Sequence, residues 1–160
     1  MRVRHAMTTN IITVVPDDRA WTAAELVTRV GITGLPVVDA NDAVLGMVTD
    51  LDFIRTYRKG GNLDTLTVGE VMRHRPPLVS PDAELYEAAA LMEEWRVRLL
   101  PVVEDGRLAG IISRGDVLRG LAHRDGRPVA TGLSVGTSNG SSKPSVNAST
   151  VPLWELGGES

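Results

Sequence analysis

The chain has 160 residues, 42% of them hydrophobic and 23% charged, which suits one ordinary domain or two small ones with a packed core. Its 17 basic and 20 acidic residues give a formal charge of −3 without a basic block, so the composition does not favour a general nucleic-acid or membrane surface. The absence of cysteine excludes disulfides and thiolate chemistry, and no apolar run reaches the roughly 18 residues of a membrane-spanning helix. We therefore expect a globular, cytoplasmic protein.

The first half of the chain predicts a unit of strand, helix, strand, strand and helix. β-Branched and apolar runs predict the strands, and apolar residues at helical spacing up to Gly31 predict the first helix. The polar turn Asp39–Asp42 between two apolar runs is typical of a hairpin. The expected elements are a strand at Ile11–Val15, a helix at Ala20–Val30, strands at Leu35–Val38 and Val44–Val48, and a helix at Asp50–Tyr57.

The second half repeats the first. Met7–Asp39 aligns with Met72–Glu104 at an offset of 65, and Gly46–Arg55 aligns with Gly110–Arg119 at an offset of 64. An internal duplication of this size indicates that one supersecondary unit was copied and that the two copies pack on each other. The elements expected in the second copy are Leu78–Val79, Leu85–Trp95, Pro101–Val103, Leu108–Ile112 and Gly115–Ala122.

The composition changes after the second copy. We predict one repeat over residues 1–60, a second over residues 61–124 and a tail over residues 125–160. Gly, Ser, Thr, Asn and Pro dominate the tail, which cannot bury enough apolar surface to offset its ordering entropy, so we expect it to be flexible. The short apolar segment around Trp154 is either part of this flexible tail or a docking segment.

Both copies place a small hydroxyl residue at the end of the last strand and an aspartate three residues later. These pairs are Thr49 with Asp52, and Ser113 with Asp116. One interpretation is a capping box at the start of the following helix. The other is a ligand site, because amides and a hydroxyl at a helix N-terminus suit a phosphate and a carboxylate can accept two hydrogen bonds from a ribose diol. The recurrence in register favours a nucleotide-binding role in addition to the cap.

At these motifs the chain resembles the cystathionine-beta-synthase-type (CBS) domain family, whose paired repeats form a Bateman module. The resembling segments include ITGLPVVD and VLGMVTDLDFIR in the first copy and LLPVVEDGRLAGIISRGDVLR in the second, within Val3–His123. The resemblance implies an α/β (α+β) fold of two tandem β-α-β-β-α repeats packed with pseudo-twofold symmetry. It also implies two clefts for an adenosyl ligand, AMP, ADP, ATP or S-adenosylmethionine, and a regulatory role without a catalytic cofactor.

The resemblance also assigns candidate residues to the clefts. Thr49 and Asp52 match the phosphate-side hydroxyl and the ribose-binding aspartate of one cleft, and the Ser113 pair matches those of the other. Residues in the leading segments and beside the Leu-Pro-Val strands match adenine or phosphate contacts, although core packing explains the apolar ones equally well. The candidate ligand-binding residues are Ile12, Thr13, Thr33, Gly34, Pro36, Thr49, Asp52, Pro77, Leu78, Arg98, Pro101, Ser113, Arg114 and Asp116.

The two clefts are expected to be unequal because their charged residues differ. Arg98 and Arg114 suit charge-assisted contacts with a phosphate, whereas their counterparts in the first copy are Thr33 and Asp50. We therefore expect the phosphate-rich ligand in the cleft that Arg98 faces, and AMP or an uncharged adenosyl group in the cleft that contains Thr49. A solvated arginine at a charged helix end is the alternative for Arg98.

We expect a sensor module that forms a homodimer and acts on another protein. Helices with small residues, such as Ala23 and Ala88, are candidates for the dimer contact, although packing within the chain explains them too. One alternative is a nucleotide-free interaction scaffold that uses the repeats and the tail. Another is a nucleic-acid-binding module around Arg96, Arg98 and Arg114, which the negative net charge disfavours.

Catalysis and metal binding are not expected from the motifs. No nucleophile, base and oxyanion site can be assembled from the sequence, and the three histidines lack ligand spacing. The short basic cluster Met72–Arg75 lies at the boundary between the copies and lacks aromatic partners for base stacking. We interpret this cluster as a solvated loop.

Overall fold

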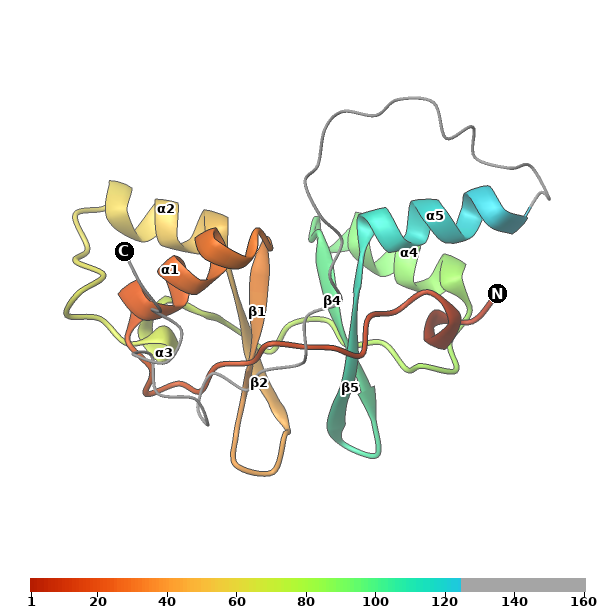
Figure 1. Ribbon diagram of the computed structural model, residues 1–160, viewed down its shortest axis with the longest axis horizontal. Coiled ribbons are helices and arrows are strands. Elements are labelled where there is room, and N and C mark those ends of the chain that lie inside the picture. The colour runs from red at the N-terminus through yellow and green to blue at the C-terminus, as the bar shows by residue number, and fades with distance from the viewer. Residues whose placement is uncertain (125–160) are drawn as a thin grey trace.

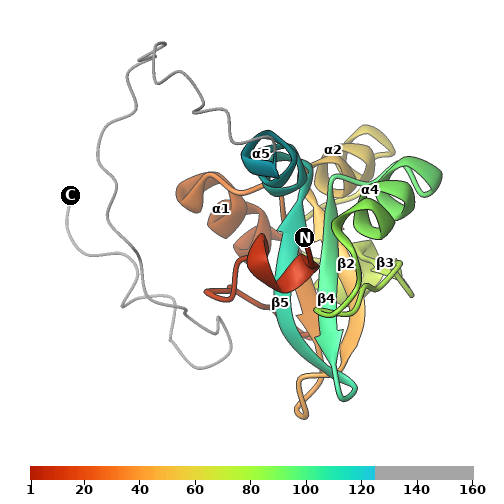
Figure 2. The same ribbon diagram turned by 90° about the vertical axis from the view of Figure 1, so that its right-hand side faces the viewer.

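The computed structural model describes residues 1–124, and the tail predicted at 125–160, with its Trp154 segment, lies outside the described residues. The mixed α/β fold with two tandem repeats is confirmed. Figure 1 shows the repeats side by side, with β1 and β2 in one, β4 and β5 in the other, and the helices α1, α2, α4 and α5 toward one end. Figure 2 shows the hairpin turns at the opposite end.

The predicted hairpins and long helices are confirmed, with small differences at their ends. Three shorter elements, η1, α3 and β3, were not predicted, because two to four residues are too few to show a hydrophobic period. Within residues 1–124, no helix has the length and apolarity to cross a membrane. The elements are η1 (Val3–His5), α1 (Ala20–Val30), β1 (Gly34–Val38), β2 (Val44–Thr49), α2 (Asp50–Arg58), α3 (Val68–Val71), β3 (Arg73–His74), α4 (Leu85–Glu94), β4 (Leu99–Glu104), β5 (Arg107–Ser113) and α5 (Arg114–Arg124).

The small residues of α1 and α4 pack inside their own repeats. Gly31 ends α1 in the left-handed region, with φ of 72°, and its N–H donates to the carbonyl of Val27. Ala23 and Ala88 have no exposed surface and belong to the cores of the first and second repeats. Packing within the chain therefore accounts for these alanines, and they are not available for contact with a second copy.

The strands expected at Ile11–Val15 and Leu78–Val79 are reduced to single parallel pairs. Val14 pairs with Val37 of β1, and Val79 pairs with Val102 of β4. Prolines flank both segments, and a proline has no N–H to continue a ladder of hydrogen bonds. Each leading segment therefore lies along its hairpin without forming a longer strand.

The repeats exchange short segments. Val3 of η1 is fully buried in the core of the second repeat, and Val68 of α3 is fully buried in the core of the first. Thr8 exchanges two 2.9 Å backbone hydrogen bonds with Ile111 of β5, and β3 pairs antiparallel with β2. In Figure 1 the N-terminal segment begins beside α4 and α5 and crosses to α1, while α3 lies beside α1. Each buried valine contributes about 1.5–3 kcal/mol to this docking.

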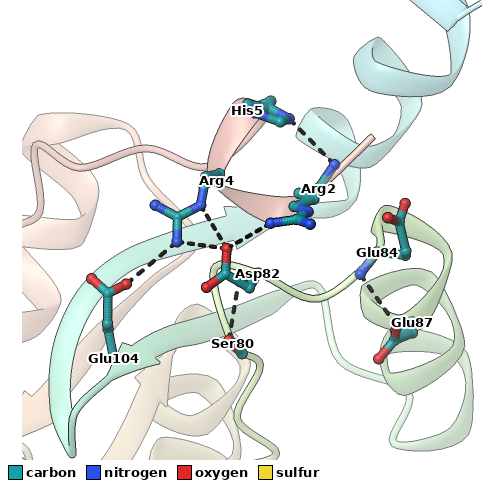
Figure 3. A network of polar contacts seen from close by, with 8 residues as sticks. All are labelled: Arg2, Arg4, His5, Ser80, Asp82, Glu84, Glu87 and Glu104. Carbon is teal, nitrogen blue, oxygen red and sulfur yellow. Dashed lines mark hydrogen bonds and ion pairs between the residues drawn. The ribbon is translucent and has the colours of Figure 1, made fainter.

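Ion pairs hold η1 to the second repeat. Figure 3 shows Arg2 and Arg4 directed at Asp82, with Glu104 on the other side of Arg4. The Arg4 Nη2 atom lies 2.7 Å from Asp82 Oδ1 and 3.4 Å from Glu104 Oε1, and Arg2 Nη1 lies 3.2 Å from the same Asp82 oxygen. The hydrogen bond from Arg4, with its charge, lowers the pKa of Asp82 and outweighs the opposing effect of desolvation.

Stability should therefore fall in acid partly through Asp82. Because its folded-state pKa is lowered, the carboxylate stabilises the folded state at neutral pH, and this contribution is lost as the pH falls through that pKa. We expect Asp82→Asn to lower the melting temperature at pH 7 slightly, since the groups are exposed, and the difference from the parent to disappear once Asp82 is protonated. Asp17→Asn, at the equivalent position, is the control, since Asp17 makes no ion pair within residues 1–124. An equal, pH-independent loss in both variants would contradict the prediction.

Gly46 and Gly110 should be required where the exchanged segments cross β2 and β5. A Cβ atom on Gly46 would lie 2.6 Å from the carbonyl oxygen of Arg73, and one on Gly110 would lie 2.9 Å from Met7 Sδ and 3.0 Å from the Thr8 carbonyl oxygen. We expect alanine at either position to lower the free energy of unfolding by about 1–3 kcal/mol, measured by urea denaturation.

Gly115→Ala is the matched control for these two substitutions. A Cβ atom there would make ordinary contacts of 3.5 and 3.6 Å, and the position is helical. We expect it to change stability little or to raise it by about 0.5–1 kcal/mol. A Gly46→Ala variant as stable as this control would show that the crossing tolerates a side chain.

Candidate functional site

Two clefts lie between the repeats, and each is built from both of them. The larger, named here the Ser113 cleft, has a volume of about 920 Å³ and is lined by Ile12 and Gly34 of the first repeat and by Ser113 of the second. The smaller, the Thr49 cleft, has a volume of about 500 Å³ and is lined by Thr49 of the first repeat and Pro77 of the second. Both volumes fall in the range of small-molecule sites.

The linings of the two clefts correspond under the repeat alignment. Ile12, in the Ser113 cleft, aligns with Pro77 in the Thr49 cleft, and Ile111 aligns with Met47. This correspondence confirms the expected pseudo-twofold symmetry. It arises from the exchange, because the leading segment of each repeat lies against the last strand of the other.

The capping interpretation of the hydroxyl and aspartate pairs is confirmed in both repeats. The backbone N–H and the hydroxyl of Thr49 donate to Asp52 Oδ2 over 2.9 and 2.8 Å, and the corresponding distances from Ser113 to Asp116 Oδ2 are 2.7 and 2.6 Å. Each aspartate N–H donates back to the hydroxyl oxygen. The cap therefore uses one carboxylate oxygen, Oδ2, and orients the other away from it.

The second oxygen of each aspartate faces an arginine. Arg73 Nε lies 3.4 Å from Asp52 Oδ1, and Arg119 pairs with Asp116 Oδ1. Both aspartate side chains are more than nine-tenths buried, and a buried carboxylate requires such a partner. A ligand hydroxyl that binds either carboxylate must therefore displace the guanidinium or share the oxygen with it.

Comparison with known proteins shows to which family this arrangement belongs. A family model described as "CBS domain" matches residues 3–59 and 68–123. The chain belongs to the CBS domain family. CBS domain-containing protein YhcV of Bacillus subtilis is 34% identical over 116 residues, which cover 72% of this chain and 81% of YhcV.

Two further CBS proteins extend the comparison. The solved structure titled "Crystal structure of CBSX2 in complex with AMP", from Arabidopsis thaliana, shares 33% identity at a TM-score of 0.68 and covers 78% of this chain and 98% of that one. An inosine-5'-monophosphate dehydrogenase of Methanocaldococcus jannaschii is 38% identical over 111 residues, which cover 69% of this chain but 21% of that enzyme. CBS repeats of this kind thus occur both as small proteins and within an enzyme.

Most of the predicted site residues line the CBS clefts. Four do not: Thr13 is buried beside the core, Leu78 is exposed, Pro101 is buried in β4, and Asp52 is buried behind its pair with Arg73. The predicted residues that line the Ser113 cleft are Ile12, Thr33, Gly34, Pro36, Arg98, Ser113, Arg114 and Asp116. Those that line the Thr49 cleft are Thr33, Thr49, Pro77, Arg98 and Arg114.

The interpretation of Met72–Arg75 as a solvated loop is wrong in its local structure, although Arg73, His74 and Arg75 are exposed as expected. Arg73 and His74 form β3 in the sheet of the first CBS repeat, and Arg73 and Arg75 line the Thr49 cleft. The repeat alignment contained the missed signal, because the equivalents of Arg73 and Arg75 are Thr8 and Asn10, which line the Ser113 cleft.

Backbone strain accompanies two arginines of the Thr49 cleft. Arg75 and Arg96 both have φ of 52°, in the left-handed region that costs a non-glycine residue roughly 1–2 kcal/mol. The equivalent of Arg96 in the first repeat is Gly31, which adopts the same region without a side chain. Arg96 thus occupies a position that suits glycine, and it belongs to the lining of the cleft.

Asp50 was expected to disfavour a polyphosphate in the Thr49 cleft, and the arginines in the lining weigh against that expectation. The Thr49 cleft contains Asp50 as its single acidic lining residue, together with five arginines: Arg73, Arg75, Arg96, Arg98 and Arg114. The Ser113 cleft contains four arginines, of which Arg29 pairs with Glu25 and Arg119 with Asp116. The Thr49 cleft is therefore the more positive of the two, and repulsion by Asp50 is outweighed by arginines that all come from the second repeat.

Proposed function

We propose that the chain is a regulatory module whose two clefts bind adenosyl nucleotides. The supporting observation is that each cleft repeats one arrangement, a capped hydroxyl from one repeat beside the leading segment of the other, with the capping carboxylate in the lining of the Ser113 cleft and behind Arg73 at the Thr49 cleft. The outward carboxylate oxygen suits a ribose hydroxyl, and the helix N-terminus suits a phosphate. The AMP complex of CBSX2 supports the same class of ligand.

We assign different ligands to the two clefts. The Thr49 cleft, with its excess of arginines, suits the phosphate-rich ligands ADP or ATP. The Ser113 cleft, in which two of four arginines are paired with acidic residues, suits AMP or the adenosyl group of S-adenosylmethionine. Asp50 alone would predict the polyphosphate in the Ser113 cleft. This assignment places it in the Thr49 cleft instead.

The proposed mechanism is a change in the relative orientation of the repeats. A ligand in either cleft contacts both repeats, so its binding favours the orientation that closes around it. A partner protein that binds one orientation more tightly than the other senses the ligand, with a coupling free energy of about 1–3 kcal/mol. The module itself acts on its target without chemistry of its own. Its cytoplasmic location stays a prediction.

A stripe of exposed apolar residues supports a homodimer. Ile54 and Tyr57 on α2 are 60% and 77% exposed, and their equivalents on α5, Leu118 and Leu121, are 66% and 46% exposed. These positions recur in both repeats, on the exposed parts of α2 and α5. A second copy offers the same stripe, as a twofold interface requires.

A nucleic-acid-binding role is the second candidate. The five arginines of the Thr49 cleft favour it, because they attract any polyanion. Binding to RNA or DNA would fall steeply with salt concentration, whereas nucleotide binding in a cleft that also uses the carboxylate would depend on salt less. An empty interaction scaffold is the third candidate, and it requires no ligand at all.

Thermal melting with AMP, ADP, ATP and S-adenosylmethionine tests the nucleotide proposal. At a ligand concentration of 100 Kd we expect a stabilisation of about 2.7 kcal/mol. Asp52→Ala should reduce the shift caused by ligands of the Thr49 cleft, and Asp116→Ala the shift caused by ligands of the Ser113 cleft. No shift with any ligand, in a protein that melts cooperatively, would leave the two motifs as helix caps and favour the scaffold.

Glu70→Ala is the control for loss of a cap. Glu70 accepts a 2.8 Å hydrogen bond from the Thr67 N–H in a third capping box, and neither residue lines a cleft. This substitution should lower the stability of the free protein by about 1 kcal/mol, as the two aspartate substitutions also do through their caps. The ligand-induced shift should remain intact only in Glu70→Ala.

Analytical ultracentrifugation tests the dimer. We expect the parent to sediment with twice the single-chain mass of 17.2 kDa and Leu118→Lys to sediment with the single-chain mass, because a lysine places a charge in the apolar stripe. Leu45→Lys, at an exposed position on β2 and not on either of the two helices that carry the stripe, should not change the mass. A Leu118→Lys variant that remains dimeric would move the interface elsewhere.

A further inference from the structure

Two arginines line both clefts. Arg98 and Arg114 belong to the lining of the Ser113 cleft and also to that of the Thr49 cleft. They lie where the repeats meet, since Thr33 and Leu99 are common to both linings as well, and a Cβ atom on Gly34 would come within 3.3 Å of Leu99 Cδ1. The clefts are therefore adjacent, and these two arginines belong to the lining of both.

The Arg114 side chain is held by one hydrogen bond, and both arginines keep free donors. The backbone N–H of Arg114 donates to the carbonyl of Arg98 over 3.0 Å, and its Nε atom donates to the carbonyl of Val97 over the same distance. Within residues 1–124, the terminal amino groups of Arg114 and the side chain of Arg98 have no hydrogen-bond or ion-pair partner. Both therefore offer unused charge-assisted hydrogen bonds to a ligand.

The first repeat does not contribute an equivalent pair of arginines. The equivalents of Arg98 and Arg114 are Thr33 and Asp50, which are joined by the equivalent backbone hydrogen bond of 2.9 Å. Neither carries a positive charge. Two clefts consequently meet at a single pair of cations, both contributed by the second repeat.

We propose that the two clefts compete for this arginine pair, so that a phosphate group in one cleft weakens the binding of a phosphate group in the other. The proposal rests on the nucleotide-binding function proposed above. Once the pair is engaged by one phosphate, a second phosphate finds no free donors there and meets a like charge in the adjacent cleft. An uncharged adenosyl ligand does not use the pair and is unaffected.

Phosphate binding in the Ser113 cleft should depend on the shared arginine pair more than phosphate binding in the Thr49 cleft does. The Thr49 cleft has three further arginines: Arg73 is paired with Asp52, but Arg75 and Arg96 make no ion pair within residues 1–124 and can contact the phosphates of its ligand. In the Ser113 cleft, Arg29 and Arg119 are already paired with Glu25 and Asp116, which leaves the shared pair as its main phosphate contact. ATP in the Thr49 cleft should therefore lower the affinity of the Ser113 cleft for AMP.

Isothermal titration of AMP at rising fixed concentrations of ATP tests this coupling. We expect the apparent Kd of AMP to rise by about 5–150-fold and then reach a plateau, since AMP still binds its own cleft. Adenosine, which has no phosphate, should bind equally well at every ATP concentration. A rise without a plateau for both ligands would indicate simple competition for one cleft and overturn the proposal, as would an AMP affinity that does not change.

Substitution of the shared arginines tests whether their charge carries the coupling between the clefts. Arg98→Gln and Arg114→Gln should each weaken AMP binding without ATP and bring the ratio of the two AMP affinities, with and without ATP, toward one. Arg96→Gln, which alters an arginine of the Thr49 cleft alone, should weaken ATP but keep the plateau ratio. An unchanged ratio in Arg98→Gln and Arg114→Gln would overturn the proposal. Failure of AMP and ATP to bind the parent would instead overturn the nucleotide-binding function itself.

Discussion

The structure depends on the exchange of short segments between the two repeats. Each repeat leaves a gap in its own core and an open edge on its hairpin, and the other repeat fills both, with Val3 on one side and Val68 on the other. Gly46 and Gly110 allow the crossing segments to approach the strands closely. Because the exchange brings the leading segment of one repeat against the last strand of the other, it also creates the two clefts.

The capping boxes show how one group serves both the fold and the site. The Oδ2 atom of each aspartate completes the start of a helix, which fixes the direction of the carboxylate, and Oδ1 is left for a partner. An arginine occupies that oxygen in both repeats, so the carboxylate is never buried without a counter-charge. A ligand that displaced this arginine would have to supply hydrogen bonds of its own to the carboxylate, because a buried charge left without a partner is strongly destabilising.

Local features were predictable from the sequence, and contacts between the repeats were not. Apolar spacing and Gly31 define α1, and polar turns define the hairpins, because these signals act within a few residues. The role of Arg73 was missed because its partner, Asp52, lies 21 residues earlier in the chain and on the other repeat. The charge of the Thr49 cleft was misjudged for the same reason, since Asp50 was weighed without the arginines that the second repeat brings to it. The alignment of the copies nevertheless indicated which positions are equivalent.

Because of the exchange, the residues of the two cores become complete at different times during synthesis. The first core draws its residues from a continuous stretch that ends near β3, so every part of it is present soon after α3 has been made. The second core combines residues 79–117 with Val3 from the far end of the chain. The segment around Val3 is therefore made before the repeat on which it packs, and it must wait, with its apolar side chain uncovered, until α4 and α5 have followed.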